Sequence, residues 1–202
     1  MVEIDGYFVT DLARTLVDLA RVTTFLGAVV ALDAGVRSSF QLLNGERVRG
    51  ATKDELIDRL ETAASTRGRR AAQSAIEFCD GASGSVGESL SRGQMHLLGV
   101  PAPRLQVRMP RPDGPDDIVD FDWPEFGLFG EFDGTGKYLR SEYLGDLDTA
   151  DAVIAEKRRE DRIRRRHRPF AVRWGWDTAI RPRRLARRMD EAGLPRSSQI
   201  HP

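Results

Sequence analysis

The stretch that decides the fold is Asp117–Lys137, DIVDFDWPEFGLFGEFDGTGK, in which two apolar runs carry carboxylates and are joined by a short turn. Apolar and polar side chains alternate with a period of two, so both runs are predicted to be strands. Aspartate and glutamate are poor strand formers, and a buried carboxylate is costly unless a cation or hydrogen-bond donors compensate it. Asp120 and Glu131 lie inside these apolar strands. A divalent metal site is one explanation for them.

The same alternation predicts which side chains share a face. In the first strand one face is expected to carry Ile118, Asp120 and Asp122, and the other Val119, Phe121 and Trp123. In the second strand Phe129, Glu131 and Asp133 are expected on one face.

Length and composition indicate a folded globular protein with a core. The chain has 202 residues, of which 40% are hydrophobic. Cys79 is its one cysteine, so a disulfide framework within the chain is excluded and a cytoplasmic location is favoured. No run approaches the roughly 18 apolar residues that a membrane span needs, and no signal peptide is recognised. We therefore expect a cytoplasmic protein without a membrane partner.

The net charge of zero conceals a segregation of charge along the chain. Residues 111–151 hold twelve acidic and three basic residues, whereas residues 157–188 hold fourteen basic and three acidic ones. An acidic metal centre beside an arginine-rich flank would suit a polyanionic substrate. Alternatively, the two segments neutralise each other as solvated faces.

The order of elements predicts an α/β protein in two parts. Residues 1–80 are predicted to be mostly helical and contain no catalytic constellation, and residues 80–87 (DGASGSVG) are the best candidate for a linker. Residues 85–193 are predicted to fold as helix, three strands, helix, strand and helix. That order gives a mixed four-stranded sheet flanked by helices. Residues 194–202 are expected to be a loose tail.

Several short motifs in the second part carry a family resemblance. They are Val119-Asp120, Trp123-Pro124-Glu125, Glu131-Phe132-Asp133-Gly134, residues 155–164 (AEKRREDRIR) and Arg173-Trp174-Gly175-Trp176. Together they resemble the PD-(D/E)xK nuclease superfamily, the restriction-endonuclease-like fold, and within it small bacterial domains related to the very-short-patch repair endonucleases. The resemblance implies a restriction-endonuclease-like sheet and a Mg²⁺- or Mn²⁺-dependent DNA endonuclease.

The start of the chain carries a second resemblance. Residues 9–21 (VTDLARTLVDLAR) are similar to a segment that precedes such domains in actinobacterial antitoxin proteins of the AbiEi type. Those proteins commonly begin with a DNA-binding winged helix, and no such module fits before residue 9. The start is therefore expected to be that of a truncated or short-form relative.

Asp120 and Glu131 would be the core of the metal site. On adjacent antiparallel strands they are expected to face each other within about one residue, and opposed side chains lie about 5 Å apart at Cβ. That separation suits a shared Mg²⁺ ion, which would activate water and relieve charge on the phosphorane. Asp133, two residues beyond Glu131, would be a further ligand.

Other candidates complete the expected catalytic set. Glu88 resembles an acid on the first helix of the family, or else it closes that helix in a capping box with Ser85. The superfamily signature ends in a lysine, where this chain has Asp133. Lys137 or Lys157 would take the role of that lysine, and the alternative for both is a surface ion pair.

The helix predicted at residues 149–167 is rich in arginine. Its expected contacts with nucleic-acid phosphates are Arg158, Arg162, Arg165 and Arg166. The alternative is a solvated face around the apolar positions of that helix.

The absence of the signature lysine keeps a rival hypothesis open. Under this hypothesis the chain is a non-catalytic, antitoxin-like protein of a toxin–antitoxin or phage-defence system. It would bind DNA or a partner such as a cognate toxin. A remnant without independent activity is a third alternative, and the sequence leaves the oligomeric state open.

Overall fold

The computed structural model describes the chain except residues 1, 5, 42–44, 135–145 and 198–202. The chain divides into two compact units, residues 1–93 and 94–202. The division falls within helix α5 (Val86–Leu97), beyond the linker that the sequence suggests at 80–87. In the described part of the chain, no helix is long and apolar enough to cross a membrane.

The first unit is a small layer of helices. Its main elements are α1 (Leu12–Val22), α2 (Phe25–Gly35), α3 (Lys53–Glu61) and α4 (Arg69–Phe78). Two short hairpins accompany them, β1 (Val2–Ile4) with β2 (Tyr7–Val9) and β3 (Phe40–Gln41) with β4 (Arg47–Val48). The helices share an apolar core that includes Leu32, Leu56 and Ile76, which are almost fully buried. The helical N-terminal region predicted from the sequence is confirmed.

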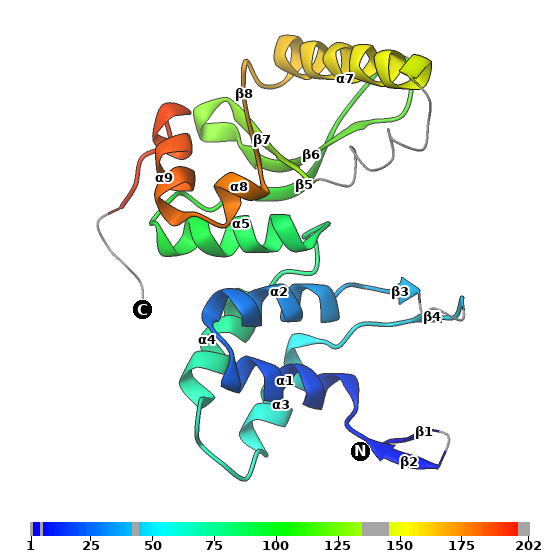
Figure 1. Ribbon diagram of the computed structural model, residues 1–202, viewed down its shortest axis with the longest axis vertical. Helices are drawn as coiled ribbons and strands as arrows, with labels where there is room; N and C mark the ends of the chain where they lie inside the picture. The colour runs from blue at the N-terminus through cyan, green and yellow to red at the C-terminus, as the bar shows by residue number, and fades with distance from the viewer. Residues whose placement is uncertain (1, 5, 42–44, 135–145, 198–202) are drawn as a thin grey trace. The chain divides into compact units, whose positions relative to one another are not determined.

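The second unit is built on a mixed four-stranded sheet (Figure 1). Its strands are β5 (Arg104–Met109), β6 (Asp117–Trp123), β7 (Leu128–Asp133) and β8 (Phe170–Gly175), in that spatial order. The first three strands pair antiparallel, and β8 pairs parallel to β7. Parallel neighbours need a long crossover, which α7 (Asp146–Arg166) supplies. The predicted fold class, α/β with a mixed four-stranded sheet flanked by helices, is confirmed.

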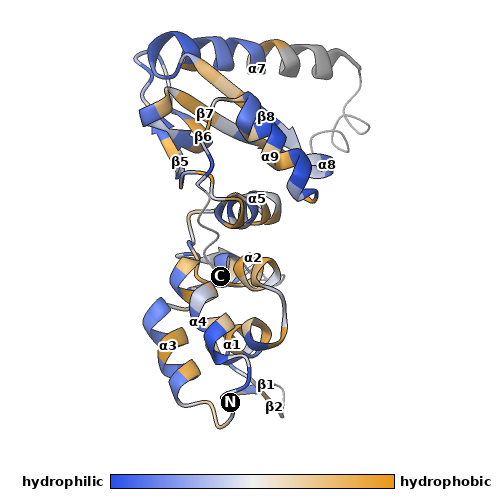
Figure 2. Ribbon diagram, turned by 90° about the vertical axis from the view of Figure 1, so that its left-hand side faces the viewer, coloured by the Kyte–Doolittle hydropathy of each residue, from blue (hydrophilic) through white to orange (hydrophobic). Residues whose placement is uncertain are grey.

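Helix α7 packs on one face of the sheet through a narrow apolar contact. Ile163 is fully buried and belongs to one cluster with Met109, Val119 and Phe129. The rest of the described part of α7 is largely hydrophilic (Figure 2). Polar contacts therefore supply most of the remaining attachment of α7 to the sheet.

The opposite face of the sheet is aromatic. Phe121 packs against Trp174 with ring centroids 5.2 Å apart. Gly130 lies against the side chains of Trp123 and Trp174, and a Cβ at this position would come within 3.0 Å of both. Helix α8 (Trp176–Ala179) joins this face through an edge-on contact of Trp176 with Phe132, and α9 (Pro182–Glu191) follows it.

The residues after α9 are held to the second unit as far as Ser197. Leu194 is 2% exposed, and the Ser197 N–H donates a hydrogen bond of 2.8 Å to the Gly99 carbonyl. From the sequence we expect a loose tail from residue 194. The burial of Leu194 and the hydrogen bond of Ser197 instead hold residues 194–197 against the second unit.

The strand that carries Asp120 is kinked at that residue. In a regular strand Val119 and Phe121 would share a face, as the sequence predicted, but Val119 belongs to the cluster of Ile163 on α7 and Phe121 packs on the aromatic face. The position opposite Asp120 in β5 is Gln106, whose φ of 48° lies in the left-handed region. Both strands are therefore irregular at the same level.

The Asp120 carboxylate bridges this irregularity. Its Oδ2 accepts a hydrogen bond of 2.9 Å from the Phe132 N–H of β7, and its Oδ1 accepts one of 3.1 Å from Gln106 Nε2. The backbone pairing of β6 with β7 ends at Phe121 and Gly130. Beyond that pair, the Asp120 carboxylate accepts the hydrogen bond of a β7 backbone N–H. A polar side chain at this position has a structural reason independent of any metal.

We expect Asp120→Ala to lower the free energy of unfolding of the second unit by about 1–3 kcal/mol, because it leaves a part-buried N–H and an amide without their acceptor. Asp120→Asn keeps an acceptor oxygen and should cost clearly less. Urea unfolding followed by tryptophan fluorescence measures this, since all three tryptophans lie in the second unit. The exposed Asp116→Ala is the control. Equal losses for the alanine and asparagine variants would contradict the bridging role.

Candidate functional site

The two acids expected to form the site lie next to each other in the sheet. The last register pair between β6 and β7 is Phe121 with Gly130, and Asp120 and Glu131 are the next positions on the two strands. This placement agrees with the expectation from the sequence. Their surroundings decide what the pair can bind.

Glu131 is a buried carboxylate with an arginine on each oxygen. Its side chain is 6% exposed, Oε1 lies 2.6 Å from Arg159 Nη1, and Oε2 lies 2.9 Å from Arg173 Nη2. Arg159 comes from α7, and Arg173 is the direct register partner of Glu131 on β8. The carboxylate therefore joins three elements, β7, β8 and α7.

Further acids on α7 extend these pairs into a network. Glu156 Oε1 lies 3.0 Å from Arg159 Nη1 and 2.6 Å from Arg173 Nη2, and Glu160 Oε2 lies 3.3 Å from Arg173. Arg159 also donates to the Ile118 carbonyl. Asp117 Oδ1 also lies 3.9 Å from Arg159 Nε, so the two arginines are shared among four carboxylates.

Burial and ion pairing act on these groups in opposite directions. Burial raises the pKa of Glu131, and the lowering by Arg159 and Arg173 does not fully offset it. For both arginines burial acts to lower the pKa, but the carboxylates of Glu131 and Glu156 outweigh it and raise it above the ordinary value. Both guanidinium groups therefore remain charged at physiological pH.

Two further acids of the β6–β7 hairpin, Asp117 and Asp122, are also neutralised by arginine. Asp117 lies 3.0 Å from Arg162 of α7. Asp122, which is 1% exposed, accepts hydrogen bonds of 2.6 and 2.9 Å from the Nε and Nη2 of Arg168. The acidic hairpin and the basic segment after it therefore meet in the fold. This is the neutralisation that the sequence left as an alternative, although here it is partly buried.

Three of these partners were not among the candidates drawn from the sequence. They are Arg159, Arg168 and Arg173. The opposite charge of the two segments was the signal for them, but which arginine meets which acid depends on the packing of α7 and on the β7–β8 register.

The arrangement does not fit a Mg²⁺ ion. Mg²⁺ takes oxygen ligands in octahedral geometry. Among the residues that the structure describes, no three potential metal-ligating side chains lie together, so an ion here would be held by one or two carboxylates and water. A cation at Glu131 would also lie against two guanidinium groups, and both Asp120 oxygens already accept hydrogen bonds. We therefore derive no chemical step through a metal ion.

The remaining acids and lysines expected at the site are dispersed. Asp133 is half-buried at the end of β7, and Lys157 is exposed on α7. Glu88 belongs to the first unit, where its Oε2 accepts from the Gly84 N–H at 2.7 Å and its own N–H donates to Ser85 Oγ at 3.2 Å. These bonds are those of a helix cap. Lys137 lies outside the described residues.

The four arginines expected to contact nucleic acid divide into two groups. Arg162 faces the sheet and binds Asp117. Arg158, Arg165 and Arg166 are exposed on α7. The outward group is available to a polyanion, whereas the inward one serves the fold.

Comparison with known proteins yields distant relatives. No family model matches the chain, and no solved structure matches it. The chain is similar to two uncharacterized proteins of Mycobacterium tuberculosis, from strains CDC 1551 and H37Rv, each 30% identical over 130 residues. The match covers 64% of this chain and 44% of each relative, so the chain spans less than half the length of these curated relatives.

Glu131 should make stability depend on pH in a defined direction. Its folded pKa lies above the ordinary 4.5, so the stability that it contributes is fully present below pH 4.5 and is lost as the pH rises through the folded pKa. Relative to Glu131→Gln, the wild type should therefore become less stable with rising pH in that window, by at most about 1.4 kcal/mol per pH unit.

Urea unfolding at a series of pH values checks this. The exposed Glu125→Gln serves as the control and should follow the wild type throughout. A wild type that gains stability over Glu131→Gln as the pH rises above 4.5 would contradict the raised pKa.

Proposed function

We propose that the chain is a non-catalytic, DNA-binding protein with a nuclease-like fold. The observation that carries the proposal is the pairing of Glu131 with Arg159 and Arg173. It places two positive groups where a nuclease of this type would need a divalent cation. The mixed sheet and the motifs that resemble the very-short-patch repair endonucleases support descent from a DNA-processing fold.

The exposed arginines support DNA as the partner. Arg158, Arg165 and Arg166 project from the outer side of α7, and the nearest described acid to Arg165 is Asp161 at 3.9 Å. Exposed arginines bind backbone phosphates and release counterions from DNA, which gives affinity without sequence readout.

A non-catalytic DNA-binding protein could serve as an antitoxin-like component of a toxin–antitoxin or phage-defence system. The resemblance of residues 9–21 to AbiEi-type antitoxin proteins supports it, with a cognate toxin as a further partner. A cytoplasmic location follows from a DNA partner and suits the lone, buried Cys79.

One observation favours a second candidate, a metal-dependent DNA endonuclease. Asp120 and Glu131 occupy adjacent positions on neighbouring strands. For this function Arg159 and Arg173 would have to leave Glu131, for example to bind DNA phosphates. The two candidates differ in whether cleavage occurs, so one experiment separates them.

The experiment measures binding and cleavage of a fluorescein-labelled DNA duplex. We expect binding that weakens with salt, and no cleavage with Mg²⁺ or Mn²⁺. The triple variant Arg158→Gln, Arg165→Gln and Arg166→Gln should reduce the salt slope by about 2–3, because each phosphate contact contributes about 0.9. The exposed Arg70→Gln in the first unit is the matched control and should bind as the wild type does.

Two results would contradict the proposal. Metal-dependent cleavage that Asp120→Ala and Glu131→Ala abolish would establish the endonuclease instead. A wild type that fails to bind DNA at low salt would remove the DNA-binding function.

A further inference from the structure

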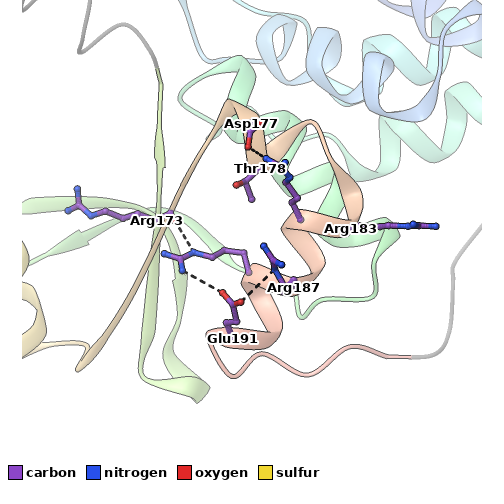
Figure 3. A pocket seen from close by; sticks show the side chains of 8 residues that line it. Arg173, Asp177, Thr178, Arg183, Arg187 and Glu191 are labelled. Atoms are coloured by element: carbon purple, nitrogen blue, oxygen red, sulfur yellow. Dashed lines mark hydrogen bonds and ion pairs between the residues drawn. The ribbon is translucent and has the colours of Figure 1, made fainter.

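A second basic surface lies between β8, α8 and α9, on a different element from the arginines of α7. It is a pocket of about 630 Å³. Five arginines line it: Arg173, Arg183, Arg184, Arg187 and Arg188. Figure 3 shows them arranged mainly along α9. We call this site the α9 pocket.

The sequence of α9 directs its arginines outward. Leu185 and Met189 are fully buried and anchor one side of the helix. Four positions of the helix, 183, 184, 187 and 188, are arginines, and Arg184 is three and four residues from Arg187 and Arg188. Residues at these spacings are neighbours on a helix surface, about 5–6 Å apart at Cβ. The helix thus presents a row of guanidinium groups.

The acids in the pocket hold these arginines weakly. Glu191 lies 3.7 Å from both Arg187 Nε and Arg188 Nη1, which is beyond hydrogen-bonding distance. Asp177 pairs with Arg184, but its side chain is 62% exposed. Exposed ion pairs of this kind contribute little and exchange readily for another anion. In the described part of the chain, Arg183 has no ion-pair partner.

One arginine is fixed by the sheet. Arg188 Nε donates a hydrogen bond of 3.1 Å to the Arg173 carbonyl of β8. The Arg173 side chain points away from α9 (Figure 3), toward Glu131. One wall of the α9 pocket is thus strand β8, which also supplies Arg173 to the Glu131 network.

We propose that the α9 pocket binds backbone phosphates of the nucleic acid. This inference rests on the proposed DNA-binding function and adds a contact surface to it. Guanidinium groups match phosphate oxygens in a bidentate geometry. The arginines follow the length of α9 and do not enclose a single anion, so successive phosphates of a strand fit them better than one small phosphate ligand.

The test compares DNA binding of three variants over a range of salt concentrations. We expect the triple variant Arg183→Gln, Arg184→Gln and Arg187→Gln to bind at least about tenfold more weakly, with a salt slope lower by about 2–3. Glu191→Gln should bind several-fold more tightly, because it removes a negative charge from the pocket. Arg70→Gln should match the wild type. All these side chains are exposed, and tryptophan fluorescence verifies folding.

The outcomes distinguish the two proposals. If the wild type binds DNA and neither the triple variant nor Glu191→Gln changes the affinity or the salt slope, the α9 pocket is not a phosphate site and the DNA-binding function stands. If the wild type does not bind DNA at low salt, the proposed function itself fails and this inference fails with it.

Discussion

The second unit depends on the ion pairs of the Glu131 carboxylate with two arginines, Arg159 and Arg173. A carboxylate whose side chain is 6% exposed in the middle of a sheet needs compensating charge or hydrogen-bond donors. Arg159 and Arg173 supply both, and they come from the crossover helix and the parallel strand. The pairing therefore also sets where α7 lies on the sheet. Removing one partner of such a pair leaves a buried charge uncompensated, which is more costly than the pair itself.

The same chemistry recurs throughout the chain. On β6, Asp122 is compensated by Arg168, and in the first unit Asp33 is fully buried against Arg92 at 2.8 Å. A single apolar residue, Ile163, is the fully buried contact between the described part of α7 and the sheet. Arginine–carboxylate ion pairs thus join many of the elements to one another. The exposed arginines remain available to a polyanionic partner.

The sequence predicted the fold well and the site only in part. Period-two alternation predicted β6 and β7, and the element order predicted the mixed sheet, because both depend on local patterns. The kink at Asp120 was missed, since no glycine or proline marks it and its partner Gln106 adopts a positive φ that glutamine rarely takes. The buried acids predicted a compensating cation or hydrogen-bond donors, and in the structure donors meet Asp120 while two guanidinium groups meet Glu131. Whether that cation is a metal ion or a guanidinium depends on long-range packing, which no local pattern contains.

The central claim is that guanidinium groups, and not a metal ion, compensate Glu131. Thermal unfolding of the wild type and Glu131→Gln in Mg²⁺ or Mn²⁺, against KCl of equal ionic strength, tests it most directly. A metal ion that binds only the folded state raises the midpoint temperature of unfolding. At a concentration one hundred times its Kd, it adds about 2.7 kcal/mol to the free energy of unfolding. We predict no metal-specific shift of the midpoint temperature for either protein. A rise in the wild type that Glu131→Gln abolishes would contradict it.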